Sequence, residues 1–264
     1  MTSSPVTPHR SPRAERAELT FAACTALFTV VLVLTNIIGT KLFVLFPDGG
    51  PSWILDGKPW TLTTGIITYP LTFLLTDVVS EIWGRRRATF MVLSGFFMSL
   101  LMLGVLQLAI ALPASPFWAQ TQFGFEDGQA MQNAYHATFA NPGVLIFASM
   151  MAYLVAQLFD VRLYHFWWKV TRGKHMWLRN NGSTFISQLV DTIIVNGIFL
   201  RFGAGFGPQN GWTWGAIGEV ILAVYLCKLL LAMLDTPLIY LARSAFERFL
   251  GIEHDPARTS APLA

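Results

Sequence analysis

The chain has 264 residues, of which 53% are hydrophobic and only 12% are charged, and its mean hydropathy is +0.50. A soluble domain usually carries about 25% charged residues, so this chain has too few to cover a large core with a charged surface. The composition excludes most soluble enzymes and any disordered or collagen-like chain. It predicts that lipid surrounds much of the protein.

Six apolar segments are long enough to cross the roughly 30 Å hydrocarbon core of a bilayer, which takes about 20 helical residues. They lie at residues 19–46, 61–84, 88–112, 138–168, 183–202 and 215–242. These segments predict an all-α polytopic membrane protein, a bundle of six transmembrane helices. Residues 1–18 are predicted to form a disordered tail, residues 19–250 the six-helix transmembrane domain, and residues 251–264 a second tail.

Three local features modify this scheme. Residues 47–60 are rich in Pro and Gly and predict a small hairpin on the outer face. The loop at 113–137 has no Lys or Arg and has room for a short interfacial helix. Pro70 predicts a kink within the second span, either a packing feature or a sign of a substrate site.

Most of the 18 Lys and Arg residues fall on one side of the predicted spans. They precede the first span and follow the second, fourth and sixth, within residues 10–16, 85–87, 162–179 and 243–258. Because loops rich in Lys and Arg stay on the cytoplasmic side, both termini are predicted to be cytoplasmic, in a multi-pass protein of the cell (inner) membrane. The basic pI of about 9.0 then needs no nucleic-acid partner.

Ionisable side chains inside membrane spans are costly, by about 2.5–3.5 kcal/mol each on insertion scales, and by default they mark functional positions. Asp77 and Glu81 are four residues apart and share one helix face. Two carboxylates placed so would repel each other unless a proton, a cation or a hydrogen-bond donor lies between them. The alternative for Glu81 is a cytoplasmic-end residue paired with the arginines of 85–87.

Other spans also carry a polar stripe, and together the stripes predict a cavity between helices. The remaining candidates, span by span, are Asn36 and Lys41, Gln188 and Asp191, and Lys228. The alternative role for Lys228 is a structural ion pair with Asp77 or Asp191. The fourth span has Asp160 approaching its basic cytoplasmic end. A carboxylate and an amide beside aromatic rings suit a flat, donor-rich heterocycle such as a guanine-like base.

The blocks YPLTFLLTDVVSEIWGR at 69–85, SQLVDT at 187–192 and YLCK at 225–228, with Asn36 and Lys41 before them, resemble the queuosine precursor transporters, a branch of the vitamin uptake transporters. The resemblance covers about residues 20–245. It implies import of 7-cyano-7-deazaguanine (preQ0), of its aminomethyl relative (preQ1), or of both. The substrate-binding residues that it implies are Asn36, Lys41, Asp77, Glu81, Gln188, Asp191 and Lys228. Carboxylates would accept from the base, and Lys228 or Gln188 would donate to its ring carbonyl.

Two other functions remain open at this stage. One is the substrate-binding membrane subunit of a vitamin importer energised by partner ATPases. The other is a membrane-embedded enzyme, although DDxxD-like, HExxH and GxSxG motifs are missing from the sequence. We therefore expect a protein that is not an enzyme, with no cofactor and no metal. Its expected partners are a small-molecule deazapurine and the lipid bilayer, without nucleic acid, and a homodimer is left open.

Overall fold

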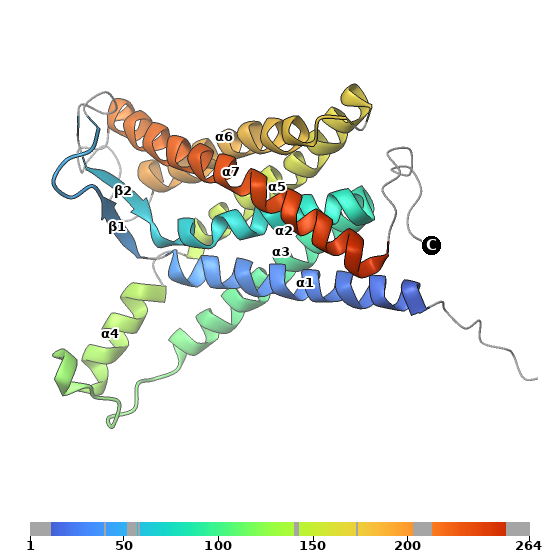
Figure 1. The fold of residues 1–264 in the computed structure, drawn as a ribbon. Coiled ribbons are helices and arrows are strands. Elements are labelled where there is room, and N and C mark those ends of the chain that lie inside the picture. The colour runs from blue at the N-terminus through green and yellow to red at the C-terminus, as the bar shows by residue number, and fades with distance from the viewer. Residues whose placement is uncertain are drawn as a thin grey trace, which may run out of the picture.

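The computed structural model describes residues 12–39, 41–51, 57, 59–139, 143–172, 174–202 and 213–251, and within them the fold is helical with one small hairpin (Figure 1). The α-helices are α1 (Pro12–Ile38), α2 (Tyr69–Trp83), α3 (Arg85–Ala111), α4 (Gly128–Phe139), α5 (Gly143–Thr171), α6 (Met176–Phe202) and α7 (Trp214–Leu250). The strands β1 (Leu42–Leu45) and β2 (Trp60–Thr63) pair antiparallel, and the 3-10 helices are η2 (Thr64–Ile67) and η3 (Thr121–Phe123).

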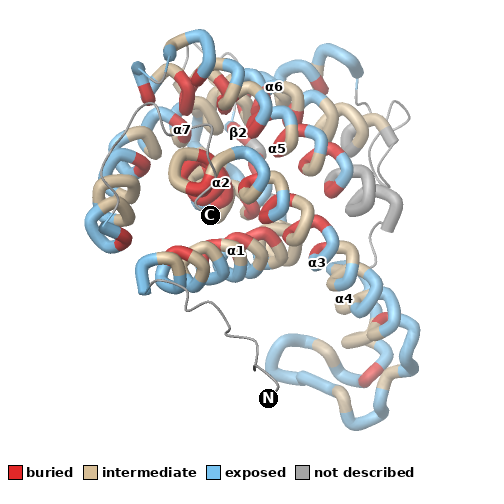
Figure 2. The backbone as a smooth tube through the Cα atoms, turned by 90° about the vertical axis from the view of Figure 1, so that its right-hand side faces the viewer, coloured by how far each residue is buried: buried red, intermediate tan, exposed pale blue. Residues whose placement is uncertain are grey.

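Within the described part of the chain, three helices, α1, α3 and α7, are long and apolar enough to cross a membrane. With a rise of about 1.5 Å per residue, the 27 residues of α1 or of α3 reach roughly 40 Å, more than the hydrocarbon core requires. Their outward faces carry exposed apolar side chains, such as Leu101 and Leu108 on α3 and Leu234 on α7. Figure 2 shows exposed residues on the outer faces of the helices and buried residues where the helices adjoin one another. Apolar residues outside and polar residues inside are typical of a polytopic membrane protein.

The first two predicted spans differ from the structure at the point where they meet. The helix α1 ends at Ile38, and residues 42–45, which the first span included, form β1 instead. The second span begins as β2 and η2, so α2 starts only at Tyr69 and has 15 residues, about 22 Å. Glycine allows this arrangement, because a Cβ on Gly39 would lie 2.7 Å from the carbonyl oxygen of Thr35 and 3.9 Å from the Cα of Gly65.

The predicted kink at Pro70 is wrong for a related reason. Pro70 lies in the first turn of α2, where its missing N–H costs no helical hydrogen bond. Pro70 is therefore part of the start of α2 and does not bend the helix. The predicted chain reversal at 47–60 is present, but the strands that form the hairpin flank this segment.

Two further boundaries changed. The helix α1 begins at Pro12, so residues 12–18 of the predicted disordered tail are helical, with Ala17 buried against the bundle. The loop at 113–137 does contain a short helix, α4, which continues to Phe139. The amide Nε2 of Gln132 donates to the carbonyl of Ile110 at 2.9 Å and so ties α4 to the end of α3.

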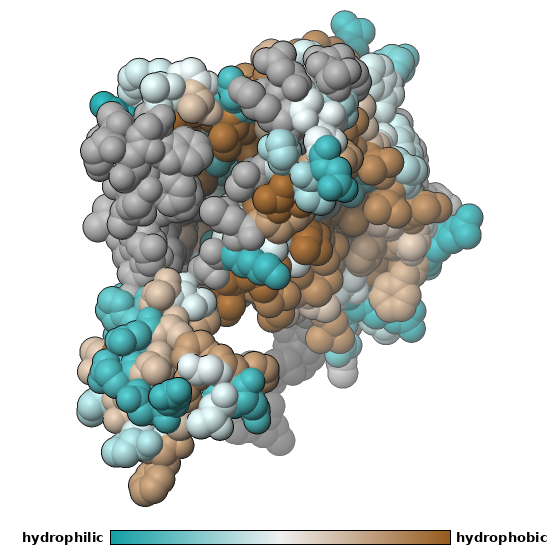
Figure 3. Space-filling model, turned by 90° about the vertical axis from the view of Figure 1, so that its left-hand side faces the viewer, coloured by the Kyte–Doolittle hydropathy of each residue, from teal (hydrophilic) through white to brown (hydrophobic). Residues whose placement is uncertain are grey.

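Figure 3 shows the surface from the end of the molecule where the hairpin lies. Polar residues gather on the lobe at the bottom of this view, and apolar residues cover much of the side of the bundle at the right.

The short helix α2 lies at the centre of the bundle, and α1, α3, α5 and α7 contact it (Figure 2). Most of its residues between Thr72 and Trp83 are buried. Contacts gather the basic helix ends at one end of the bundle: Arg87 at the start of α3 pairs with Glu18 of α1, and Arg243 of α7 pairs with Glu81 of α2. The polar interior and the charged end therefore both surround α2.

Candidate functional site

A cavity lies between α2, α6 and α7. It is partly open to the surroundings. Its walls are Tyr69, Pro70, Phe73, Leu74 and Asp77 from α2, Asn180, Thr184 and Gln188 from α6, and Lys228, Leu231, Ala232, Asp235 and Ile239 from α7. Residues on each helix recur every three or four positions, the spacing of one helix face. Small-molecule sites are commonly of this kind: mainly apolar and aromatic, with a few converging polar groups.

Lys228 is held at the edge of this cavity by Asp191. Its Nζ donates to Oδ2 of Asp191 at 2.7 Å, and the hydroxyl of Tyr69 donates to the same oxygen at 2.7 Å. The ammonium also lies 4.2 Å from the centre of the Tyr69 ring, a cation–π contact. The ion pair expected as the alternative role for Lys228 is therefore present, and its partner is Asp191 and not Asp77.

Three polar atoms in the cavity wall have no hydrogen-bond partner within the described part of the chain. They are Oδ1 of Asp77, Oε1 of Gln188 and Oγ1 of Thr184, on side chains that are at most 4% exposed. A buried polar atom without a partner costs about 1–3 kcal/mol. Three such atoms on two facing helices make a set of acceptors that a donor-rich ligand would satisfy.

Two predicted site residues of the first span lie outside the cavity. Asn36 donates from Nδ2 to Oγ of Ser99 at 3.3 Å and so links α1 to α3. Lys41 is exposed beyond the end of α1, and its carbonyl accepts from the amide of Thr64 at 2.9 Å. The reason is that the helix ends at Ile38, which moves Lys41 out of a span and toward the hairpin.

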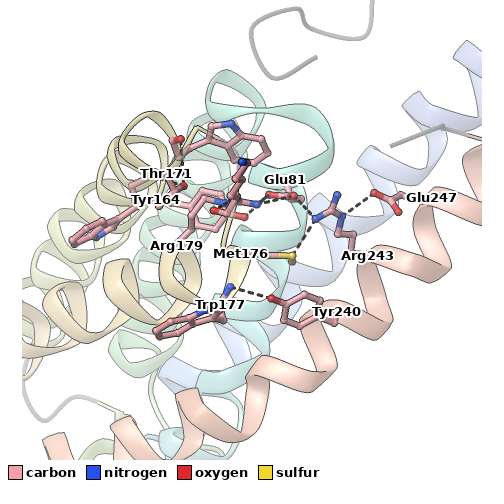
Figure 4. Close-up of polar contacts among 12 residues, drawn as sticks. Glu81, Tyr164, Thr171, Met176, Trp177, Arg179, Tyr240, Arg243 and Glu247 are labelled. Atoms are coloured by element: carbon pink, nitrogen blue, oxygen red, sulfur yellow. Dashed lines mark hydrogen bonds and ion pairs between the residues drawn. The ribbon is translucent and has the colours of Figure 1, made fainter. Parts of the chain in front are cut away.

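Glu81 also lies outside the cavity, in a separate charged cluster at the basic end of the bundle (Figure 4). Both of its oxygens accept from Nη2 of Arg179 at 3.0 Å, and Nη1 of Arg243 pairs with Oε1 at 2.8 Å. The hydroxyl of Tyr164 donates to Oε2 at 2.5 Å. We call these four residues the Glu81 cluster; it joins α2, α5, α6 and α7.

The cluster differs from the pairing expected from sequence. Glu81 meets Arg179 and Arg243, and not the arginines of 85–87. Arg179 was expected in a cytoplasmic loop, yet it lies on α6, is only 1% exposed, and has its guanidinium 4.0 Å from the centre of the Trp168 ring. Nε of Arg243 also pairs with Glu247 at 2.8 Å, which adds a further carboxylate to this end of the bundle.

We expect Glu81→Gln to destabilise the protein. The change leaves two buried arginines without their shared carboxylate, and breaking a buried ion pair typically costs about 3–5 kcal/mol. Thermal unfolding of the detergent-purified protein measures the effect. The matched control is Glu18→Gln, whose more exposed pair with Arg87 is worth at most about 1 kcal/mol. A variant that melts like the wild type but transports nothing would instead place Glu81 in the transport pathway.

Sequence reasoning missed part of the interior. Asp160 was expected near the basic end, but it is fully buried and accepts a hydrogen bond from Oγ of Ser187 at 2.8 Å. Asn180 fell outside the predicted fifth span, because Arg179, Asn180 and Asn181 lower the local hydropathy where α6 in fact continues. The spacing of four residues from Asn180 to Thr184 to Gln188 is the signal that would have found this wall of the cavity.

Comparison with known proteins identifies the family. The family described as "Putative vitamin uptake transporter" matches residues 63–242, well over half of the chain. The chain belongs to this family. It is therefore a transporter and a multi-pass membrane protein. The vitamin uptake transporter match runs from the end of β2 into α7 and includes all walls of the cavity.

A relative from Bacillus subtilis (strain 168) named "Probable queuosine precursor transporter" is 29% identical over 189 residues, 69% of this chain and 72% of the relative. The comparison with solved structures gave no match.

Proposed function

We propose that this vitamin uptake transporter imports 7-deazaguanine precursors of queuosine, preQ0 or preQ1, across the inner membrane. The observation that carries the proposal is the set of unpartnered acceptors in the cavity, led by Oδ1 of Asp77. The name of the Bacillus subtilis relative supports the same substrate class.

The chemistry of the base fits this wall of the cavity. A deazaguanine presents ring N–H and amino donors side by side, and a carboxylate accepts such a pair well. Asp191 is already engaged by Lys228 and Tyr69, whereas Asp77 has a buried oxygen without a partner among the described residues. Lys228 is then positioned to donate to the ring carbonyl. The rings of Tyr69 and Phe73, with centroids 5.1 Å apart, supply an aromatic wall for the flat base.

We further propose six membrane crossings with both termini in the cytoplasm. Five of the crossings are α1, α3, α5, α6 and α7. The remaining crossing combines α2, too short by itself, with η2 and β2, whose residues Gly65, Leu62 and Trp60 are buried. Irregular backbone is tolerated at membrane depth where protein surrounds it. The basic helix ends gathered near the Glu81 cluster support a cytoplasmic position for that end.

Cysteine labelling tests this orientation. The native cysteines, Cys24 and Cys227, are first replaced by alanine, and single cysteines are then introduced as Phe117→Cys and Lys169→Cys. Both positions are exposed, on opposite sides of the proposed membrane. We expect an impermeant maleimide to label position 117 in whole cells and position 169 only after the cells are opened. The reverse pattern would invert the topology.

The substrate itself is tested in a bacterium that cannot synthesise the deazaguanine precursor and lacks its own importer. Cells expressing the chain receive nanomolar preQ0 or preQ1, and queuosine in their tRNA is measured. We expect the modified base to appear. No queuosine despite normal expression in the membrane would refute these substrates.

A further inference from the structure

We propose that Asp77 and Asp160 form a carboxylate pair that holds one proton, and that this proton is carried inward with the substrate. The proposal rests on the proposed function for its substrate, but the proton site is argued from the geometry of α2, α5 and α6. One proton binds a carboxylate oxygen from the outer side and leaves the same oxygen toward the cytoplasm.

The register of two helices brings the carboxylates together. Tyr164 of α5 is hydrogen-bonded to Glu81 of α2 at 2.5 Å, and both helices end at the basic side of the bundle. Asp160 and Asp77 each lie four residues, about one turn, before these bonded residues. They therefore occupy matching positions on neighbouring helices, one turn further into the bundle, and Asp160 is within electrostatic range of Asp77.

Both carboxylates have an oxygen without a partner. Oδ1 of Asp77 and Oδ2 of Asp160 make no hydrogen bond within the part of the chain that the structure describes, and the two residues are 2% and 0% exposed. Nearby, the amide of Gln157, about one turn from Asp160 on α5, is also buried. Two ionised carboxylates in such a place would repel each other strongly, and one shared proton removes that repulsion.

Charged and titratable groups of four helices surround the pair. Glu81, on the same helix as Asp77, is neutralised by Arg179 and Arg243. The remaining groups that face the pair, from α5 and α7, are Tyr153, Tyr164, Asp235 and Lys228. Of these, Lys228 is engaged by Asp191. From α6, Ser187 donates to Oδ1 of Asp160 and is not titratable.

The position of the pair gives a route for coupling. Asp77 belongs to the wall of the cavity, whereas Asp160 lies behind it at the contact of α5 and α6. A proton on Asp160 leaves Asp77 ionised, ready to accept from a bound base. Binding of the base and binding of the proton therefore favour each other.

Thermal unfolding of the purified protein tests proton binding without any substrate. A folded pair that binds a proton more tightly than the unfolded chain gains stability as the pH falls. Between about pH 8 and about pH 5.5, we expect the Tm of the wild type to rise relative to Asp160→Asn by roughly 3 °C or more. Asp77→Asn removes the repulsion but leaves the carboxyl of Asp160 buried, so it should keep only part of this dependence. The control Asp48→Asn removes an exposed carboxylate in the hairpin turn, and its Tm should depend on pH as the wild-type Tm does.

Identical pH dependence in the wild type and in both variants would overturn the proposal. A wild-type Tm that differs between NaCl and choline chloride but does not change with pH would identify a sodium site. That outcome would also overturn the proposal. In proteoliposomes with a more acidic solution outside than inside, the wild type should accumulate radiolabelled precursor. Asp160→Asn should only bring the precursor to equal concentrations on both sides. If no base enters wild-type vesicles at all, the proposed substrate is wrong, and the unfolding experiment still decides on the proton.

Discussion

Replacing Asp77 by asparagine is expected to shift queuosine formation to a much higher concentration of external precursor. The change puts an amide, which carries donors, where the cavity needs a charged acceptor for the N–H groups of the base. A hydrogen bond to a charged group is worth about 1.5–3 kcal/mol. Its loss corresponds to roughly a tenfold to hundredfold weaker apparent affinity. The readout is queuosine in tRNA as a function of precursor concentration, at matched amounts of protein in the membrane.

The control for this experiment is Asp48→Asn, the same chemical change at an exposed turn of the hairpin. It should rescue like the wild type. If Asp77→Asn also rescues like the wild type over the whole concentration range, the carboxylate of Asp77 does not bind the substrate, and the proposed binding mode fails.

Replacing Lys228 by methionine is expected to destabilise the protein strongly, and a second substitution should largely restore it. Among the described residues, Lys228→Met leaves the hydroxyl of Tyr69 as the remaining partner of the buried Asp191 carboxylate. Removing one member of a buried pair typically costs about 3–5 kcal/mol, which corresponds to a fall in Tm of roughly 10 °C for a chain of this size. In the double variant Asp191→Asn/Lys228→Met no charge is left unpaired, so most of that loss should be recovered.

The four proteins of this double-mutant cycle measure the coupling between the two side chains. Lys169→Met is the matched control, since Lys169 is exposed near the end of α5 and its loss should change the Tm little. Additive effects of the two single substitutions would show that the pair is not energetically coupled. In the rescue assay, the stable double variant should still fail to import, because it lacks the ammonium proposed to bind the ring carbonyl.

Local sequence was sufficient for part of the candidate site. Asp77, Gln188 and Lys228 were candidates from the polar positions within the predicted spans, and the structure brings them together around one cavity. The ion pair of Lys228 was also foreseen, although two partners remained open. The choice of Asp191 depends on how far α6 and α7 are rotated about their axes, which no local pattern records.

Other parts of the site could not be predicted in this way. Glu81 meets Arg179 and Arg243 because three helix ends converge in space, although these residues lie 98 or more positions away in the chain. Asp160 was placed by its distance along the helix from a basic segment, whereas its burial results from the packing of α5 against α6. Asn36 and Lys41 had suitable chemistry, but α1 turns Asn36 toward α3 and ends before Lys41.

The sequence by itself determined the class of the protein, since a low charge content and apolar segments of membrane length require a lipid surrounding, and hydropathy is a sum over neighbouring residues. It also determined the gathering of basic residues at alternate loops, and the polar positions within the helices. The tertiary structure decided that α2 is short and completed by a hairpin, and which buried charges meet. Those outcomes depend on the depth, rotation and crossing of helices that are far apart in the chain, and a small rotation exchanges one partner for another.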